Sequence, residues 1–175
     1  MRQRRVFVGV AGGLVLVAAG AWVTGLRFNL SASLPPGFYI VSRGGVARGS
    51  IVLACLPANV ADFARARGYV PRGVCPGGTA PLGKLVLALW GDTVTVSAEG
   101  LWVNGALVPG SRARARDGRG RSLGRAPFGE HLVRSSQIWL ISHHPLGYDS
   151  RYFGPLTVSS VRAVVRPLWT WRRDD

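Results

Sequence analysis

The chain has 175 residues, of which 47% are apolar and 17% charged, and its formal net charge is +14 at pH 7. Its length suits one domain with an appendage, and its apolar content excludes a wholly disordered chain. The positive charge favours anionic partners, but a genome rich in arginine codons produces the same balance, so charge alone names no partner.

An apolar run near the N-terminus predicts a membrane anchor. Residues 6–26, VFVGVAGGLVLVAAGAWVTGL, contain no charged residue, and at about 1.5 Å per residue they are long enough to cross a hydrocarbon core of about 30 Å. The basic segment 1–5 predicts a cytoplasmic N-terminus, with residues 27–175 exported. A cleaved signal peptide, ending near Ala19-Gly20-Ala21, is the alternative, although its apolar region is normally shorter.

Beyond the anchor, the sequence pattern predicts a mainly β, antiparallel domain. Short runs rich in β-branched and aromatic residues, bounded by Gly or Pro, predict strands at 37–42, 50–54, 84–90, 92–97, 137–142 and 156–169. Residues 101–108 predict a hairpin, because Asn104-Gly105 suits a type I′ turn. Only residues 58–68 have a helical pattern. With no internal repeat, we expect residues 27–175 to form one β-rich domain.

Cys55 and Cys75 are the only two cysteines. They are too few for a structural zinc site without histidines, and the three histidines all lie at position 131 or later. In an oxidising periplasm a disulfide is the expected state, and two buried thiols are the alternative. The sequence therefore predicts neither a metal ion nor a cofactor.

Lys84 is the one lysine in a chain that otherwise uses 21 arginines. A guanidinium stays protonated at ordinary pH, whereas an amine loses its proton when it is desolvated. Lys84 begins the apolar run 85–90, and burial there would lower its pKa from ~10.4 to near 8 at a cost of about 3 kcal/mol. A lysine at a strand end that extends its ammonium group into solvent is the structural alternative.

Three segments form one ordered pattern: Ser31-Ala32-Ser33-Leu34-Pro35, then KLVLALWGD at 84–92, then DSRYFGP at 149–155. They resemble the Ser-x-Ser-Met-x-Pro, Lys-Arg-Val-x-Gly-x-Pro-Gly-Asp and Asp-Ser-Arg-x-x-Gly boxes of the signal peptidase I family, the Ser/Lys peptidases of the bacterial envelope. The paired cysteines and CPGGTAPLGK, residues 75–84, are similar specifically to the conjugative-transfer, TraF-like branch. The resemblance extends from residue 1 to about residue 168.

The resemblance implies a role for each matching residue. Ser33 is expected to be the nucleophile and the neutral amine of Lys84 its general base. The backbone N–H of Ser33 and the Ser31 hydroxyl are expected to stabilise the oxyanion. Asp149 and Arg151 are expected to form a charged pair that shapes the site, and a salt bridge without catalytic duty is the alternative for that pair.

The sequence departs from the family pattern at two positions. Trp90 replaces the usual proline before Gly-Asp, which affects a turn. Gly147 stands where the general leader peptidases carry a hydroxyl that contacts the lysine. The sequence alone therefore leaves open what positions the Lys84 amine.

The resemblance also implies an activity and partners. The expected activity is that of a membrane-anchored serine endopeptidase that removes signal peptides or matures propilin-type substrates in conjugative transfer, by hydrolysis or by transpeptidation. The expected partners are exported proteins and membrane lipid, and export argues against nucleic acid. The segment 111–125 carries six arginines without apolar periodicity. It is expected to be an exposed loop that assists attachment to anionic lipid and is dispensable for cleavage.

Two other readings use the same residues differently. Ser33, His143 or His144, and Asp149 would supply a Ser-His-Asp triad, but no Gly-x-Ser-x-Gly elbow surrounds the serine. The second is a non-catalytic, membrane-anchored structural component of a conjugation or secretion machine. Three ordered boxes in a chain of this size favour the enzyme.

Overall fold

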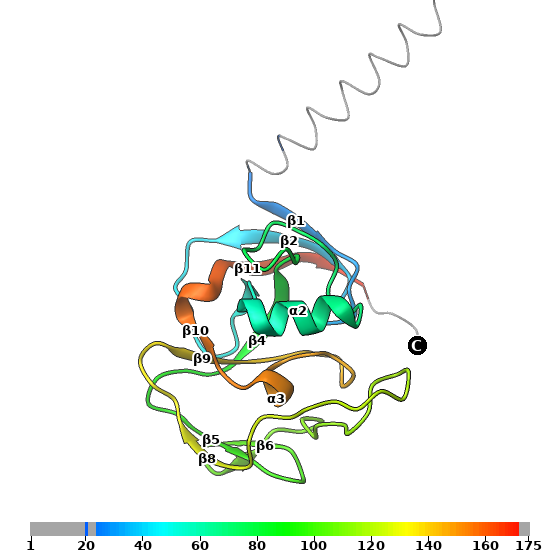
Figure 1. Ribbon diagram of the computed structural model, residues 1–175. Helices are drawn as coiled ribbons and strands as arrows, with labels where there is room; N and C mark the ends of the chain where they lie inside the picture. The colour runs from blue at the N-terminus through cyan, green and yellow to red at the C-terminus, as the bar shows by residue number, and fades with distance from the viewer. Residues whose placement is uncertain (1–19, 21–23, 172–175) are drawn as a thin grey trace, which may run out of the picture.

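Two antiparallel sheets organise the fold in the computed structural model, which describes residue 20 and residues 24–171 (Figure 1). Within this described part, the larger sheet has seven strands in the spatial order β1 (Leu26–Asn29), β2 (Gly37–Ser42), β11 (Val161–Thr170), β3 (Ile51–Ala54), β4 (Leu82–Ala88), β9 (Gln137–Ile141) and β10 (Leu156–Thr157). The smaller sheet has four, in the order β7 (Ala106–Leu107), β6 (Leu101–Val103), β5 (Thr93–Val96) and β8 (Gly129–Leu132). The prediction of a mainly β, antiparallel domain is confirmed.

Most of the predicted strands are present with small shifts at their ends. The predicted hairpin is formed by β6 and β7, with Asn104 at φ 50° and Gly105 at φ 81°, as a type I′ turn requires. The predicted helix is α2 (Ala58–Ala66). The sequence did not predict β1, β8 or the short helix α3 (Ser150–Phe153).

The prediction of one continuous strand over residues 156–169 is wrong. The chain forms β10, then the 3-10 turn η1 (Val158–Ser160), then β11. Because β10 pairs with β9 at one edge of the sheet while β11 pairs with β2 and β3, the backbone must leave one position in the sheet and enter another. The turn makes this change of position.

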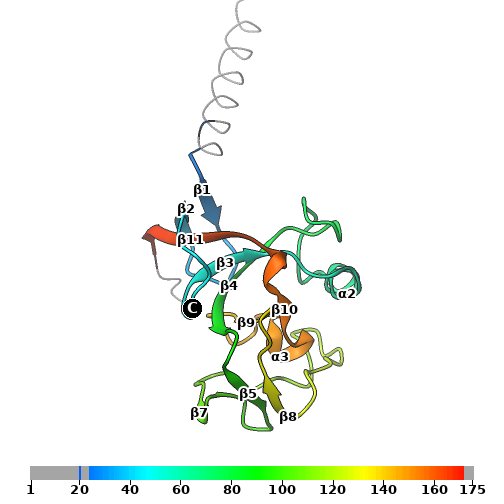
Figure 2. The ribbon, with the colours of Figure 1, turned by 90° about the vertical axis from the view of Figure 1, so that its left-hand side faces the viewer.

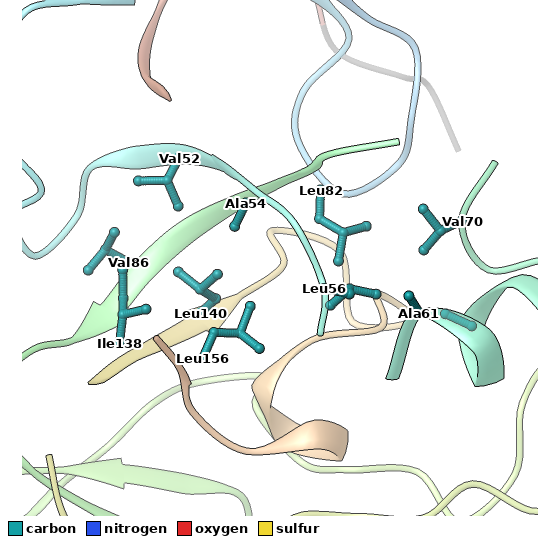
Figure 3. Close-up of a cluster of buried hydrophobic side chains, with 11 residues drawn as sticks. Val52, Ala54, Leu56, Ala61, Val70, Leu82, Val86, Ile138, Leu140 and Leu156 are labelled. Atoms are coloured by element: carbon teal, nitrogen blue, oxygen red, sulfur yellow. The ribbon is translucent and has the colours of Figure 1, made fainter. Parts of the chain in front are cut away.

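The main apolar core lies between the larger sheet and the helix α2. Alternate side chains of β3, β4 and β9 point to this side, because successive residues of a strand face opposite ways. Figure 3 shows Val52, Val86 and Leu140 on the same side of the cluster as Leu156, with Ala61 of α2 at its other end beside Leu56 and Val70. A second core, around Trp139 and Leu101, fills the space beside the smaller sheet. Figure 2 shows the two sheets at opposite ends of the domain, with β4 running toward the smaller one.

The predicted disulfide is present and joins Cys55 to Cys75, with their Cα atoms 5.5 Å apart. It connects the end of β3 to the loop that follows α2. In the chain-entropy model, closing a loop of this length stabilises the fold by roughly 3 kcal/mol. The bond therefore fixes the helix and its following loop against the core.

The predicted cytoplasmic segment 1–5 and nearly all of the predicted anchor 6–26 lie outside the described residues. The last residue of that predicted span, Leu26, begins β1 and pairs with Ile40 of β2. Among the residues that are described, no helix has the length and apolar character needed to cross a membrane.

Candidate active site

The loop that carries Ser33 connects β1 to β2 and is organised by the side chain of Asn29. The Asn29 Nδ2 amide donates to the carbonyls of Ser31 and Leu34, each at 3.1 Å, and to that of Pro35 at 3.3 Å. Its Oδ1 accepts from the Ser31 backbone N–H at 3.1 Å and from the Ser31 hydroxyl at 2.7 Å. One amide side chain therefore satisfies polar groups on both sides of Ser33. Asn29 was not among the site residues predicted from the sequence, although an asparagine beside a Ser-Pro-Gly turn is a signal for such a role.

Two hydrogen bonds fix the same loop from neighbouring strands. The Tyr39 hydroxyl of β2 donates to the Pro35 carbonyl at 2.6 Å. The backbone N–H of His143, just after β9, donates to the Ser33 carbonyl at 3.0 Å. Since Leu34 is only 3% exposed, its side chain anchors the loop in the domain as well. Ser33 is thus held by contacts from three separate parts of the chain.

Lys84 lies inside β4, where its side chain points to the buried face of an alternating strand. It is 1% exposed. Its Nζ lies 2.8 Å from Ser33 Oγ and 2.5 Å from Ser142 Oγ. The structure therefore brings the predicted nucleophile and the predicted base into direct contact, although 51 residues separate them in the sequence.

The surroundings of Lys84 favour a neutral amine. The pKa of Lys84 is lowered from 10.5 to about 8: burial lowers it, the Asp149 carboxylate raises it, and the positive charge of Arg151 lowers it. Burial is the largest of these effects. An amine with a pKa near 8 has a substantial neutral fraction in weakly alkaline solution, as a general base requires.

Ser142 is a site residue that the sequence analysis missed. It follows β9, whose Ile141 pairs with Leu85 of β4, so continuing this antiparallel register by one residue places Ser142 opposite Lys84. A Cβ atom at Gly147 would lie 1.9 Å from Ser142 Oγ. The hydroxyl thus occupies the space that a side chain at 147 would need. The departure noted at Gly147 is explained, because the hydroxyl on the lysine comes from position 142.

Asp149 and Arg151 form a buried ion pair, 0% and 1% exposed. Arg151 Nη2 donates to Asp149 Oδ2 at 2.7 Å and its Nε donates to Oδ1 at 2.8 Å. The other guanidinium hydrogens are directed to the carbonyls of Pro145 and Gly147, at 2.8 and 2.9 Å. Asp149 Oδ2 also accepts the Ser142 backbone N–H at 2.8 Å. The pair therefore fixes the backbone of the residue that contacts Lys84.

Two pockets meet at Ser31 and Ser33. One, of about 340 Å³, has a largely apolar wall formed by Phe28, Leu30, Leu34, Leu53, Leu82 and Val165. The other, of about 380 Å³, is lined by Tyr69, Tyr148 and Tyr152 and by Arg114 and Arg116 of the segment 111–125. A chain laid across Ser33 would thus meet an apolar surface on one side and a mixed aromatic and basic surface on the other.

The remaining predicted groups have other places in the structure. The His144 ring Nδ1 accepts the Leu146 backbone N–H at 3.1 Å, and His143 contacts Ser33 through its backbone. Because Arg151 and the Ser142 N–H take up the Asp149 carboxylate, the structure does not assemble the Ser-His-Asp triad. Trp90 is 75% exposed, in the turn that follows β4.

Comparisons with known proteins identify the family of this chain. The family model described as "Signal peptidase, peptidase S26" matches residues 1–170. The "Plasmid transfer protein TraF" of Escherichia coli is 39% identical over 168 residues, covering 95% of this chain and 93% of that protein. The "Conjugal transfer protein TraF" of Agrobacterium fabrum is 41% identical over 173 residues, 94% of either chain.

Among solved structures, a signal peptidase I from Enterococcus faecalis is similar at 19% identity and a TM-score of 0.41, covering 71% of this chain and 100% of that one. The family assignment does not depend on this last likeness. It depends on a family model that matches nearly the whole chain and on relatives that cover it with well over 30% identity. The chain belongs to the signal peptidase family, peptidase S26, with TraF proteins of conjugal transfer as its relatives.

Proposed function

We propose that this chain is a membrane-anchored serine endopeptidase with a Ser33–Lys84 dyad that removes signal peptides or matures propilin-type substrates in conjugal transfer. One observation carries the proposal: the 2.8 Å contact between Ser33 Oγ and an almost fully buried lysine amine. Burying a lysine amine costs desolvation free energy, and a lysine that only supplied surface charge would not need to be buried.

The proposed mechanism uses Lys84 twice. The neutral amine accepts the Ser33 hydroxyl proton as Oγ attacks the scissile carbonyl, while an N–H of the same amine donates to Ser142. The resulting ammonium then gives the proton to the leaving amine, so that an acyl-enzyme remains on Ser33. Water hydrolyses this ester, or an amine of the substrate attacks it in a transpeptidation.

The oxyanion requires donors close to Ser33. The Ser33 backbone N–H and the Ser31 hydroxyl are the proposed pair. Because the Ser31 hydroxyl is bound to Asn29 at 2.7 Å, it must exchange that bond for one to the substrate oxygen. Asp149 and Arg151 act through the backbone around Ser142 rather than on the substrate.

The apolar pocket suits the residues that precede the scissile bond. Its wall places Leu34, Leu53 and Leu82 beside Ser33. A Cβ at Gly83 would lie 2.6 Å from Leu34 Cδ1, so the backbone on this side is packed closely against the nucleophile loop. A substrate in extended conformation would place small apolar side chains here and pair with exposed sheet backbone.

Exposed aromatic side chains support a position at the periplasmic surface of the inner membrane. Phe28 of β1, Phe38 of β2, Trp169 of β11 and Trp171 just after β11 lie close together, and the ring centroids of the contacting pairs are 5.0–6.5 Å apart. Phe28 and Trp169 are 55% and 63% exposed. Aromatic rings of this kind favour the membrane interface, and β1 begins where the predicted anchor ends.

Cleavage by purified protein tests the proposal. Full-length wild type in detergent is expected to cleave a signal-peptide or propilin substrate, and Ser33→Ala to give no product above background. Ser159→Ala, which removes an exposed hydroxyl from η1, is the matched control and keeps full activity. Conjugation that proceeds normally in cells carrying only Ser33→Ala would instead favour the non-catalytic structural component.

A further inference from the structure

The arginine-rich segment 111–125 lines one side of the candidate active site and is held in place by hydrogen bonds to the rest of the domain. Its Asp117 accepts the Tyr69 hydroxyl at 2.5 Å, Arg121 Nε at 2.7 Å and the Arg119 backbone N–H at 2.9 Å. The Asp117 side chain is only 7% exposed, and the Tyr69 hydrogen bond is the main cause that lowers its pKa below the usual range. A β-bridge between Arg116 and Ser122 closes the turn. The segment is therefore fixed to Tyr69, which itself borders the site.

Two arginines of this wall line the same pocket as Ser33. The backbone N–H of Arg114 donates to the Tyr152 hydroxyl at 3.2 Å, which fixes where the Arg114 side chain begins. Arg116 Nη1 donates to the Gly120 carbonyl at 2.8 Å. Among the described residues, the ion pairs leave both guanidinium groups without a carboxylate, because Asp117 is paired with Arg121. Asp117 lines the pocket too, but its carboxylate is paired with Arg121, so Arg114 and Arg116 carry the positive charge that is available for contact there.

We infer that this pocket binds a carboxylate of the peptide on the leaving-group side of the scissile bond. The inference rests on the proposed function, in which the apolar pocket takes the residues before that bond. The peptide that follows the bond must then extend over the opposite pocket, toward Arg114 and Arg116. Guanidinium groups bind carboxylates with charge-assisted hydrogen bonds, and the ring faces of Tyr148 and Tyr152 offer apolar contact beside them.

The carboxylate has two chemical sources: an acidic side chain near the cleavage site, or the free C-terminus of a short leaving peptide. Both are anions of the same geometry, so the pocket alone does not separate them. Anionic lipid is a different class of partner for these arginines. Their place beside Ser33, in a pocket walled by three tyrosines, favours the peptide.

Four peptides with one cleavage site separate the sources. They carry either Glu or Gln two residues after the scissile bond, and either a free or an amidated C-terminus. For full-length wild type in detergent we expect kcat/KM about tenfold higher for a peptide with a carboxylate than for the fully neutral peptide, since two exposed charge contacts act together. The preference should fall in ~1 M salt, where the Debye length is about 3 Å.

The double variant Arg114→Gln/Arg116→Gln is expected to lose this preference, so that its kcat/KM is the same for the peptides with a carboxylate and for the fully neutral peptide. Arg119→Gln is the matched control, because it removes one positive charge from the same segment at a residue that does not line the pocket. Wild type that does not discriminate, or a double variant that still discriminates, would overturn the inference. So would a double variant that loses binding to anionic vesicles while its peptide preference is unchanged.

Failure of the proposed function is distinguishable from failure of this inference. If no peptide is cleaved, the proposed function fails, and the pocket is tested by isothermal titration with the isolated leaving peptide in its acid and neutral forms. Tighter binding of the acid form to wild type than to Arg114→Gln/Arg116→Gln supports the pocket. Equal binding of the two forms contradicts it.

Discussion

The charges around Lys84 and those of the segment 111–125 show two opposite uses of ionisable groups in one molecule. Lys84, Asp149 and Arg151 are each at most 1% exposed. Asp149 pairs directly with Arg151 and accepts the backbone N–H of Ser142, whose hydroxyl contacts Lys84. Arg114 and Arg116 are exposed. In the buried region, removal from water changes the protonation of the lysine, whereas in the exposed region the charges are constant and available for contact.

Buried and exposed charges in this molecule should respond differently to substitution. A buried charge acts through its protonation state and its fixed partners, so even a conservative replacement removes its function. An exposed arginine acts mainly through its charge, which solvent and salt screen. The comparison therefore predicts large effects near Lys84 and modest ones in the segment 111–125.

The largest expected effect is that of Lys84→Arg. The variant keeps the positive charge but cannot accept the Ser33 proton near neutral pH, so kcat should fall on the order of 10⁴-fold or more. Ser33→Ala should be about equally inactive, and the double variant little worse, because the two residues act as a unit. Steady-state cleavage assays on folded protein measure this. Substantial turnover by folded Lys84→Arg would refute the dyad.

The pH dependence of wild type sharpens the same prediction. In the proposed mechanism only the neutral amine of Lys84 is active, so kcat/KM should rise with pH through about 8, the lowered pKa of Lys84. The effect on stability has the same sign: between pH 8 and 10.5 the unfolded chain binds more protons than the folded chain, so the Lys84 contribution to stability increases as pH rises across that window. A kcat/KM that is flat from pH 6 to 10 would contradict the assigned base.

The second effect in size is that of Asp149→Asn on stability. It leaves the buried Arg151 without its counter-charge, and breaking a buried ion pair in this way costs about 3–5 kcal/mol. Asp62→Asn is the matched control, because Asp62 pairs with Arg65 at 2.9 Å on the surface, with side chains 65% and 47% exposed. Its cost should be at most ~0.5 kcal/mol. Thermal unfolding of the full-length variants measures the loss of stability for Asp149→Asn and for Asp62→Asn. Equal losses would contradict the proposed difference between buried and exposed charges.

The smallest of the three effects concerns Ser142. Ser142→Gly should lower kcat/KM about tenfold, since loss of one hydrogen bond to a charged or reacting group costs about 1.5 kcal/mol. The acid limb of the pH profile should also move to lower pH, because the ammonium form loses an acceptor. A purely structural serine would change stability without moving the pH profile.

A positional exchange tests the Ser142 assignment further. Gly147→Ser alone should be damaging, because a Cβ at 147 would lie 1.9 Å from Ser142 Oγ. Ser142→Gly/Gly147→Ser removes that clash and supplies a hydroxyl to Lys84 from position 147 instead of position 142, so activity should recover toward wild type. A double variant no better than the worse single variant would show that the hydroxyl cannot be exchanged.

Much of the domain and part of the candidate site are predictable from local pattern. Residues 37–42 form β2 with the predicted bounds, and Asn104-Gly105 forms the predicted turn, because both depend on neighbours in the sequence. Ser33, Lys84, Asp149 and Arg151 were identified from short ordered boxes and from the one lysine in an arginine-rich chain.

Tertiary structure alone decided what surrounds those residues. Ser142 reaches Lys84 through the β4–β9 register, and Asn29 reaches the Ser33 loop from a strand that the sequence did not predict. The segment 111–125, expected to be dispensable, lines the pocket at Ser33 because Asp117 is bonded to Tyr69, a residue 48 positions away. Local sequence determines which backbone conformation a segment favours and which side chains carry chemistry. Contacts between distant segments depend on strand register and loop closure, which only packing of the whole chain fixes.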